Sequence, residues 1–243
     1  MKAIEIRELT RTFGVKTAVD CLTMDVMQGE TLALLGVNGA GKTTTIKMLS
    51  CLLRPTSGDA LLLGDSIISA PERVKRKINV SPQETAVAPN LTVIENLELI
   101  AGVYGASRHD ARQRAAQMVE RFGMGEISRS RAKTLSGGWQ RRLSIAMALI
   151  SGPEILFLDE PTLGLDVLAR RELWRTIEGL RGSVTVILTT HYLEEAEALS
   201  DRVAIMQSGR LRALGTAAEI KNAAGVDDFE EAFVRLAAGE DVK

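Results

Sequence analysis

The segment from Gly36 to Thr44 places the tightest limits on the fold and the chemistry. It reads Gly-Val-Asn-Gly-Ala-Gly-Lys-Thr-Thr and matches a phosphate-binding loop, with both glycines, the lysine and the hydroxyl in place. Such a loop requires a buried strand before it and a helix after it. The apolar run 31–35 predicts the strand, and the apolar residues that follow the loop have helical spacing. These residues are Ile46, Met48, Leu49, Leu52 and Leu53.

The residue types of this loop suit the triphosphate of a nucleotide. Glycines allow positive φ and close approach to a ligand, so successive N–H groups can face an anion at a helix N-terminus. Lys42 is expected to reach the β- and γ-phosphates, and the Thr43 hydroxyl to bind Mg²⁺. The alternative, a tight turn with a surface lysine, is disfavoured because so many constrained positions coincide. The other residues expected to contact ATP are Gly36, Asn38, Gly39, Ala40, Gly41 and Thr44.

The composition of the chain is that of a globular protein and argues against several classes of protein, namely nucleic-acid-binding, membrane-spanning and secreted ones. The 243 residues are 45% hydrophobic and carry a formal net charge of −1, which gives no support for a nucleic-acid partner. No apolar stretch approaches the ~18 residues needed to span a bilayer, and the first residues lack the apolar core of a signal peptide. Cys21 and Cys51 lack metal-ligand spacing and are expected to be buried, reduced thiols, which favours the cytosol.

A second apolar run ends in two acids. The run 155–158 reads as a buried parallel strand, and open α/β sheets bind ligands at the carboxyl ends of such strands. Asp159 is therefore expected to hold the Mg²⁺ shell, and Glu160 to orient and deprotonate an attacking water. The alternative, that both acids only cap the strand at a turn, is weakened by the phosphate loop upstream.

Three further candidates follow predicted strands. His191 comes directly after the apolar strand 184–189, at a position equivalent to that of Glu160. Gln83 follows the strand 78–80, and without the rest of the chain it would be taken as solvent-facing. Phe13 lies beside a glycine turn and could be a core plug or a flat surface for a base; since most aromatic residues are core, these residues alone favour the plug.

Several predicted helix N-termini also carry candidate functional residues. Ser136 precedes Gly137 and Gly138 and could be a plain N-cap or a second helix N-terminus aimed at phosphate; the local sequence cannot separate the two. Asp166 reads as an N-cap. The acidic cluster at the start of the following helix is expected to be a solvated face. Its members are Glu194, Glu195 and Glu197.

The order of these elements predicts an α/β fold. A mostly parallel core sheet with an antiparallel β subdomain is expected over residues 1–88 and 151–216, where strands and helices alternate. Residues 89–150 read as an inserted helical subdomain, beginning with a capping box at Thr92. Residues 217–243 form a short helical tail, whose amphipathic part from Asp227 is expected to dock back on the domain.

The motifs together resemble the nucleotide-binding subunit of an ABC transporter, from about residue 2 to the tail. This resemblance implies the ABC cassette form of the P-loop NTPase fold. The run 43–49 and the ending 230–233 are most similar to single-domain bacterial exporter ATPases of the drug and antibiotic efflux type. The motifs, in chain order, are the phosphate loop, Ser81-Pro82-Gln83, Leu135-Ser136-Gly137-Gly138, Asp159-Glu160, Leu163-Gly164-Leu165-Asp166 and the strand ending at His191.

The resemblance implies a role for each undecided residue. It implies that Phe13 stacks on adenine, that Gln83 senses Mg²⁺ and water and links to a membrane subunit, and that His191 holds the γ-phosphate. It implies that Ser136–Gly138 contacts ATP held by the opposite subunit, and that Asp166 crosses the dimer interface.

The implied activity is ATP hydrolysis by a homodimer that sandwiches two ATP molecules and powers export through a separate membrane subunit, on the inner face of the membrane. The alternatives are an importer ATPase and a non-transport ABC ATPase of the DNA-repair or ribosome-associated kind. The latter usually carries coiled coils or tandem cassettes. One departure from the family is Trp139, where glutamine is usual; ATP contact should survive, with altered packing around the dimer interface or the helical subdomain.

Overall fold

A central sheet of six strands forms the middle of the computed structural model, which describes residues 1–238. Its strand order is β10-β9-β3-β8-β7-β6, and all neighbours are parallel except the β9–β10 hairpin. The carboxyl ends of β3, β7 and β8 therefore lie side by side at one edge. The strands are β3 (Thr31–Leu35), β6 (Ile78–Ser81), β7 (Ile155–Asp159), β8 (Thr185–Thr190), β9 (Arg202–Gln207) and β10 (Arg210–Gly215).

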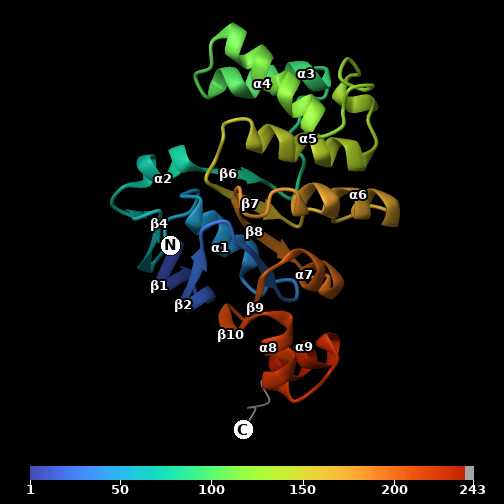
Figure 1. Cartoon of the computed structure of the whole chain (residues 1–243). Helices are drawn as coiled ribbons and strands as arrows, with labels where there is room; N and C mark the ends of the chain where they lie inside the picture. The colour runs from blue at the N-terminus through green and yellow to red at the C-terminus, as the bar shows by residue number, and fades with distance from the viewer. Residues whose placement is uncertain (239–243) are drawn as a thin grey trace.

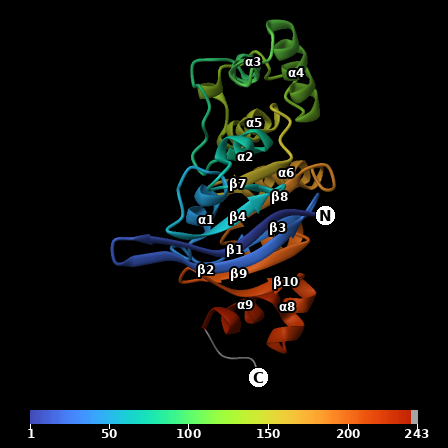
Figure 2. The same cartoon turned by 90° about the vertical axis from the view of Figure 1, so that its left-hand side faces the viewer.

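A second, antiparallel sheet has the order β2-β1-β4-β5 and is dominated by a long hairpin. Figure 2 shows this hairpin of β1 and β2 extending past the other strands. Its turn brings the end of β1 to the side of the molecule where the phosphate loop lies. The strands are β1 (Lys2–Phe13), β2 (Lys16–Met27), β4 (Ser57–Leu62) and β5 (Asp65–Ser66).

Helices cover both faces of the central sheet and extend beyond it at both ends of the molecule. Figure 1 shows α3 and α4 at one end and α8 and α9 at the other. Within residues 1–238, none of the helices has both the length and the apolar character needed to cross a membrane. The helices are α1 (Lys42–Leu49), α2 (Pro71–Lys77), α3 (Val93–Val103), α4 (Arg108–Arg121), η1 (Ala132–Thr134), α5 (Gly137–Leu149), α6 (Val167–Glu178), α7 (Leu193–Leu199), α8 (Ala217–Ala224) and α9 (Phe229–Ala238).

Two hydrophobic clusters hold the layers together, one on each face of the central sheet. Successive residues of β3 point to opposite clusters: Leu32 and Leu34 pack with the antiparallel sheet and α1, whereas Ala33 and Leu35 pack with the helices of the other face. This arrangement explains why the parallel strands are continuous apolar runs. The tail from Asp227 docks as expected, because Phe229 and Ala232 are buried in the cluster that contains Ala33 and Leu35.

Two sequence-based expectations about packing are wrong. Helix α1 ends at Leu49, because Cys51 adopts left-handed backbone (φ 57°), and Leu52 is 69% exposed rather than on the buried stripe. Neither thiol is fully buried, since Cys21 lies exposed on β2 and Cys51 is half-buried.

The acidic cluster 194–197 is also not a purely solvated face. Glu195 is 0% exposed, because helix α7 turns it inward, toward Trp174 of α6.

Candidate active site

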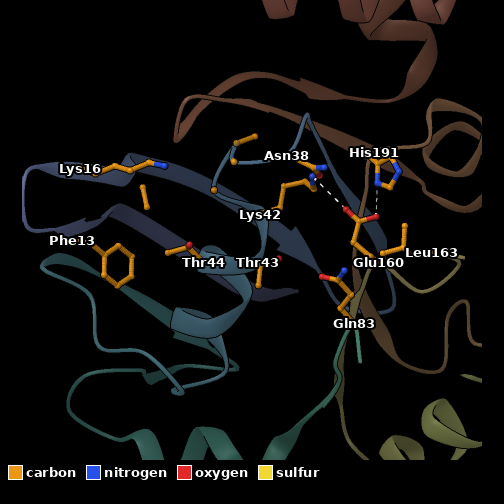
Figure 3. A pocket seen from close by; sticks show the side chains of 14 residues that line it. Phe13, Lys16, Asn38, Lys42, Thr43, Thr44, Gln83, Glu160, Leu163 and His191 are labelled. Atoms are coloured by element: carbon orange, nitrogen blue, oxygen red, sulfur yellow. Dashed lines mark hydrogen bonds and ion pairs between the residues drawn. The ribbon is translucent and has the colours of Figure 1, made fainter. Parts of the chain in front are cut away.

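A cavity of about 450 Å³ opens between the phosphate loop, the β1–β2 turn and the carboxyl ends of β7 and β8. Figure 3 shows Glu160 and His191 at one side of this cavity, and Phe13 and Lys16 at the other. The cavity brings together candidates that lie far apart in the sequence. Its lining residues are Phe13, Lys16, Ala18, Asn38, Gly39, Ala40, Gly41, Lys42, Thr43, Thr44, Gln83, Glu160, Leu163 and His191.

The phosphate loop is pressed against its neighbours at two glycines. A Cβ on Gly36 would lie 2.4 Å from the carbonyl oxygen of Met206, and one on Gly41 would lie 2.5 Å from that of Ala18. Gly41 also has φ of 103°, a conformation that a side chain would strain, and it immediately precedes α1. These glycines let the loop sit deep enough for its N–H groups to face the cavity at the helix N-terminus.

Lys42 is the cation at the floor of the cavity, and it is only 6% exposed. Its Nζ donates to the Gly36 carbonyl oxygen at 2.6 Å and lies 3.4 Å from Oε1 of Glu160. Gly36, although it does not line the cavity, therefore helps to place the lysine. The ammonium is held where it can meet a phosphate group entering the loop.

Asp159 accepts two hydroxyl groups at one carboxylate oxygen. Thr43 Oγ1 donates to Oδ1 at 3.0 Å, and Thr189 Oγ1 donates to the same atom at 2.6 Å. Hydroxyl and carboxylate oxygens are the ligands that Mg²⁺ prefers, so this pair fits a magnesium site. Within residues 1–238, no cluster of three or more His, Cys, Asp or Glu side chains could hold a metal ion by itself. A magnesium ion here would therefore need phosphate oxygens or water to complete its shell.

Glu160 is fixed at both carboxylate oxygens. Its Oε1 faces Lys42, and its Oε2 lies 2.8 Å from Nδ1 of His191 (Figure 3). Because a carboxylate only accepts, the ionised Glu160 favours the His191 tautomer with the proton on Nδ1, which makes Nε2 the ring nitrogen able to accept.

The main chain at Glu160 is strained, with φ of 47°. Its N–H is held by the Thr189 hydroxyl at 2.9 Å, and Thr189 also binds Asp159. One hydroxyl at the end of β8 thus orients both acids. Such strain is often found where a catalytic group must point in one direction.

Phe13 is 46% exposed, so the reading of this residue as a core plug is wrong. The Arg11 guanidinium lies over the ring, 4.5 Å from its centroid, and the ring lines the cavity opposite the acids. A flat, half-open aromatic ring at this position is suited to stacking on a base.

The residues Ser136–Gly138 and Asp166 are not brought into this cavity. The Ser136 hydroxyl accepts from the Trp139 N–H, and Asp166 accepts from the N–H groups of Leu168 and Ala169, so both residues are helix N-caps. Ser136 and Gly137 are exposed on another part of the surface. Within one chain, the two sets of predicted ATP ligands therefore occupy separate sites.

Trp139, the departure from the family pattern, packs beside this second site. The Arg142 guanidinium lies over its ring at 4.4 Å from the centroid, and Arg142 also pairs with Glu172 of α6 at 2.8 Å. A Cβ on Gly138 would lie 2.9 Å from that of Ala169, so the starts of α5 and α6 are closely packed. Trp139 thus contacts the arginine that joins α5 to α6.

The sequence reasoning missed several residues at the site. Lys16 and Leu163 line the cavity; no local pattern distinguishes Lys16 from a surface residue, and the motif that contains Leu163 gave no role to that side chain. Thr189 carried a usable signal, because it is a hydroxyl at the carboxyl end of a buried apolar strand.

Comparison with known proteins agrees with this geometry. Residues 19–163 match the family model described as ABC transporter. The daunorubicin/doxorubicin resistance ATP-binding protein DrrA of Streptomyces peucetius is 43% identical over 225 residues, which cover 92% of this chain and 68% of that protein.

Solved structures agree as well. An ATP-binding subunit of an ABC transporter has a TM-score of 0.84 at 30% identity and covers 96% of this chain and 99% of its own. The ATP-binding cassette MJ0796, solved as a dimer with ADP and Pi, has a TM-score of 0.79 at 24% identity, over 88% of this chain and 98% of its own. The expected resemblance and fold class are therefore confirmed. The chain belongs to the ABC transporter family, as an ATP-binding subunit that hydrolyses ATP.

Proposed function

We propose that two copies of this chain sandwich two ATP molecules head to tail and power export through a separate membrane subunit. The observation that carries the proposal is the division of ATP ligands between two surfaces. The phosphate loop and the acids share one cavity, whereas the exposed segment Ser136–Gly138 lies elsewhere. A second copy can bring its own Ser136–Gly138 segment to that cavity.

In the proposed reaction, the residues of the cavity bind ATP and activate water. Lys42 transfers its contact from the Gly36 carbonyl to the β- and γ-phosphates, and the loop N–H groups bind the same oxygens. The water oxygen attacks the γ-phosphorus as the bond to the bridging oxygen breaks, so ADP leaves and phosphate forms. Glu160 accepts the proton of that water, and His191 and Gln83 orient the water and the γ-phosphate. Thr43 and Asp159, with Gln83, would hold Mg²⁺, which neutralises phosphate charge when bound.

The dimer proposal is supported by exposed apolar side chains around Asp166. Leu163 is 43% exposed, and Val167 and Leu168 stand out into solvent at the start of α6. Exposed apolar groups that cluster beside functional residues often mark an interface. A cassette with the same fold has been solved as a dimer, which is consistent with assembly of two copies. Asp166 would then lie between the two copies.

The membrane subunit would dock beside Gln83. A groove of about 120 Å³ there lies between β6, α3 and α5, and its lining includes Pro82, Ile100, Tyr104 and Met147. Leu99 and Val103 of α3 are also exposed nearby. Docking would place the chain on the cytoplasmic face of a membrane.

In this assignment the three parts of the chain have different tasks. Residues 1–88 and 151–216 form the ATP-binding core, whereas residues 89–150 carry the Ser136–Gly138 segment and respond to the membrane subunit. Residues from 217 form a docked tail, of which 239–243 lie outside the described residues. The relatives named as drug-resistance proteins favour an exporter of drug-like molecules over an importer. Copurification of a multi-span membrane protein would also exclude the non-transport alternative, whereas a nucleic-acid or ribosomal partner would favour it.

The decisive variant is Glu160→Gln, which keeps the shape of the side chain but removes the base. We expect it to bind ATP, to lose about 10²-fold or more in turnover, and to accumulate as a dimer with ATP and Mg²⁺. Radiolabelled ATP binding, phosphate release and light scattering measure these three properties. The matched control is Glu154→Gln, an exposed acid at the opposite end of β7. Near-normal turnover in Glu160→Gln would reject Glu160 as the base.

A further inference from the structure

Arg141 of helix α5 is directed into the molecule and is only 4% exposed. Its guanidinium donates to main-chain carbonyl oxygens and not to a carboxylate. Nε donates to Pro161 at 2.9 Å, and Nη2 donates to Asp159 at 2.6 Å. Nη1 donates to Pro82 and, at 3.2 Å, to Gln83.

These acceptors belong to the two loops that carry hydrolytic residues. The carbonyl groups of Asp159 and Pro161 lie on either side of Glu160, whose main chain is strained at φ of 47°. The other two carbonyl groups belong to Gln83 and the residue before it. A planar guanidinium with five donors can hold such a set at fixed spacing, which neither an ammonium nor an amide can do.

Burying a guanidinium without a directly bonded carboxylate costs desolvation free energy, which an ordinary core position would not require. Burial lowers the pKa of Arg141 to about 10, while the charges of Asp159, Glu195 and Glu160 act to raise it. The group therefore stays charged at neutral pH. Ser144, one turn along α5, is also buried, so a smaller, neutral side chain could occupy this face of the helix.

We infer that Arg141 is a positioning residue that couples the helix beginning at Ser136 to the loops carrying Glu160 and Gln83 of the same chain. Its side chain is not part of the cavity lining, so it acts through the main chain of these loops. ATP of the partner subunit, bound at Ser136–Gly138, would shift α5 and thereby set the geometry of the hydrolytic residues. This inference rests on the proposed dimer.

The test compares the wild-type chain with Arg141→Lys and Arg141→Gln. The lysine keeps the charge but cannot bridge the four carbonyl groups, and the glutamine removes the charge. The matched control is Arg181→Gln, because Arg181 also donates to a carbonyl group, that of Leu199 at 2.9 Å, at the end of α7. ATP hydrolysis is measured against ATP concentration at several protein concentrations, together with binding of a non-hydrolysed ATP analogue and the melting temperature.

Both Arg141 variants should lose up to about 10²-fold in kcat, because a small displacement of Glu160 is sufficient for that loss. KM and analogue binding should change little, since Lys42 and Phe13 are untouched. The Hill coefficient for ATP should fall toward about 1, because each site no longer responds to its partner. Arg181→Gln should behave like the wild type.

Two results in the variants would overturn the inference. Unchanged kcat and Hill coefficient would show that Arg141 couples nothing. A parallel loss of analogue binding, melting temperature and kcat would show that it only supports folding. A wild-type hydrolysis rate per chain that does not change with protein concentration, with only monomer detected by light scattering in ATP and Mg²⁺, would instead reject the dimer. The inference would fall with it, so the two failures are distinguished.

Discussion

Glu195 is a buried acid behind the active site, and its environment should be visible in the pH dependence of stability. Its Oε1 accepts from the Trp174 indole at 3.3 Å. Burial raises the pKa of Glu195 above its ordinary value, Glu160 adds to the rise, and the hydrogen bond from Trp174 partly opposes it. The charged form is therefore disfavoured in the folded protein, although the nearby Arg141 gains from it.

We predict that Glu195→Gln stabilises the chain increasingly as pH rises. With the pKa raised in the folded state, the wild type loses stability as pH increases from the unfolded value near 4.5 through the folded value. The variant has no proton to lose there, so the two melting temperatures should coincide below this range and separate above it. Each 1 kcal/mol corresponds to about 2–4 °C for a chain of this size.

Thermal melts from acid to neutral pH measure this separation. Glu197→Gln on the same helix serves as the control, since that side chain is exposed and pairs with Lys221. A gap between wild type and Glu195→Gln that does not change with pH, or a less stable variant at neutral pH, would contradict the prediction.

At the scale of elements, the phosphate loop depends on the close packing of one glycine. Gly41→Ala would place a Cβ 2.5 Å from the Ala18 carbonyl oxygen at φ of 103°. We expect a loss of stability of about 1–3 kcal/mol from the strained backbone alone, with a further loss from the clash, and severely weakened ATP binding.

Gly39→Ala is the matched control for this loop. Gly39 also has positive φ (86°), but its Cβ would meet no atom within 4 Å. Thermal melts and nucleotide titrations of the two variants separate backbone strain from the clash. Equal losses of stability and of ATP binding in both variants would show that the close approach of the loop to β2 is unimportant.

Most elements were predictable because their signals are local. The continuous apolar run of β7 and the capping box of Thr92 and Glu95 both lie where the sequence places them. The end of α1 was not predictable, because the left-handed conformation of Cys51 is set by packing that no pattern records. The burial of Arg141 and Glu195 was missed for the same reason, since both residue types favour the surface.

At the scale of the whole molecule, the candidate site was predictable as far as topology determines it. Glu160 and His191 follow the neighbouring parallel strands β7 and β8. The carboxyl ends of these two strands lie beside the phosphate loop, so the two side chains meet there. The contributions of Lys16 and Leu163 depend on how a hairpin and a loop fold over the cavity, which spacing does not encode. The separation of Ser136–Gly138 from the cavity also depends on tertiary packing, so the sequence alone could not predict it.

This separation makes subunit complementation the sharpest test of the dimer. Lys42→Ala removes the phosphate ligand, and Gly137→Asp puts negative charge at an exposed position of the Ser136–Gly138 segment. A Cβ on Gly137 would meet no atom within 4 Å. Each variant alone should be inactive. Mixed dimers, however, contain one site with both surfaces intact. An equal mixture should therefore recover hydrolysis, at most about a quarter of the wild-type rate, because the damaged second site no longer stimulates the intact one.

The control for complementation is a mixture of Lys42→Ala with Glu160→Gln. Lys42 and Glu160 lie 3.4 Å apart in the cavity of a single chain, so every mixed dimer has both of its sites damaged. That mixture should remain inactive in the same phosphate-release assay. An inactive mixture of Lys42→Ala with Gly137→Asp would contradict the shared site, because it would mean that the Ser136–Gly138 segment does not complete the partner's cavity.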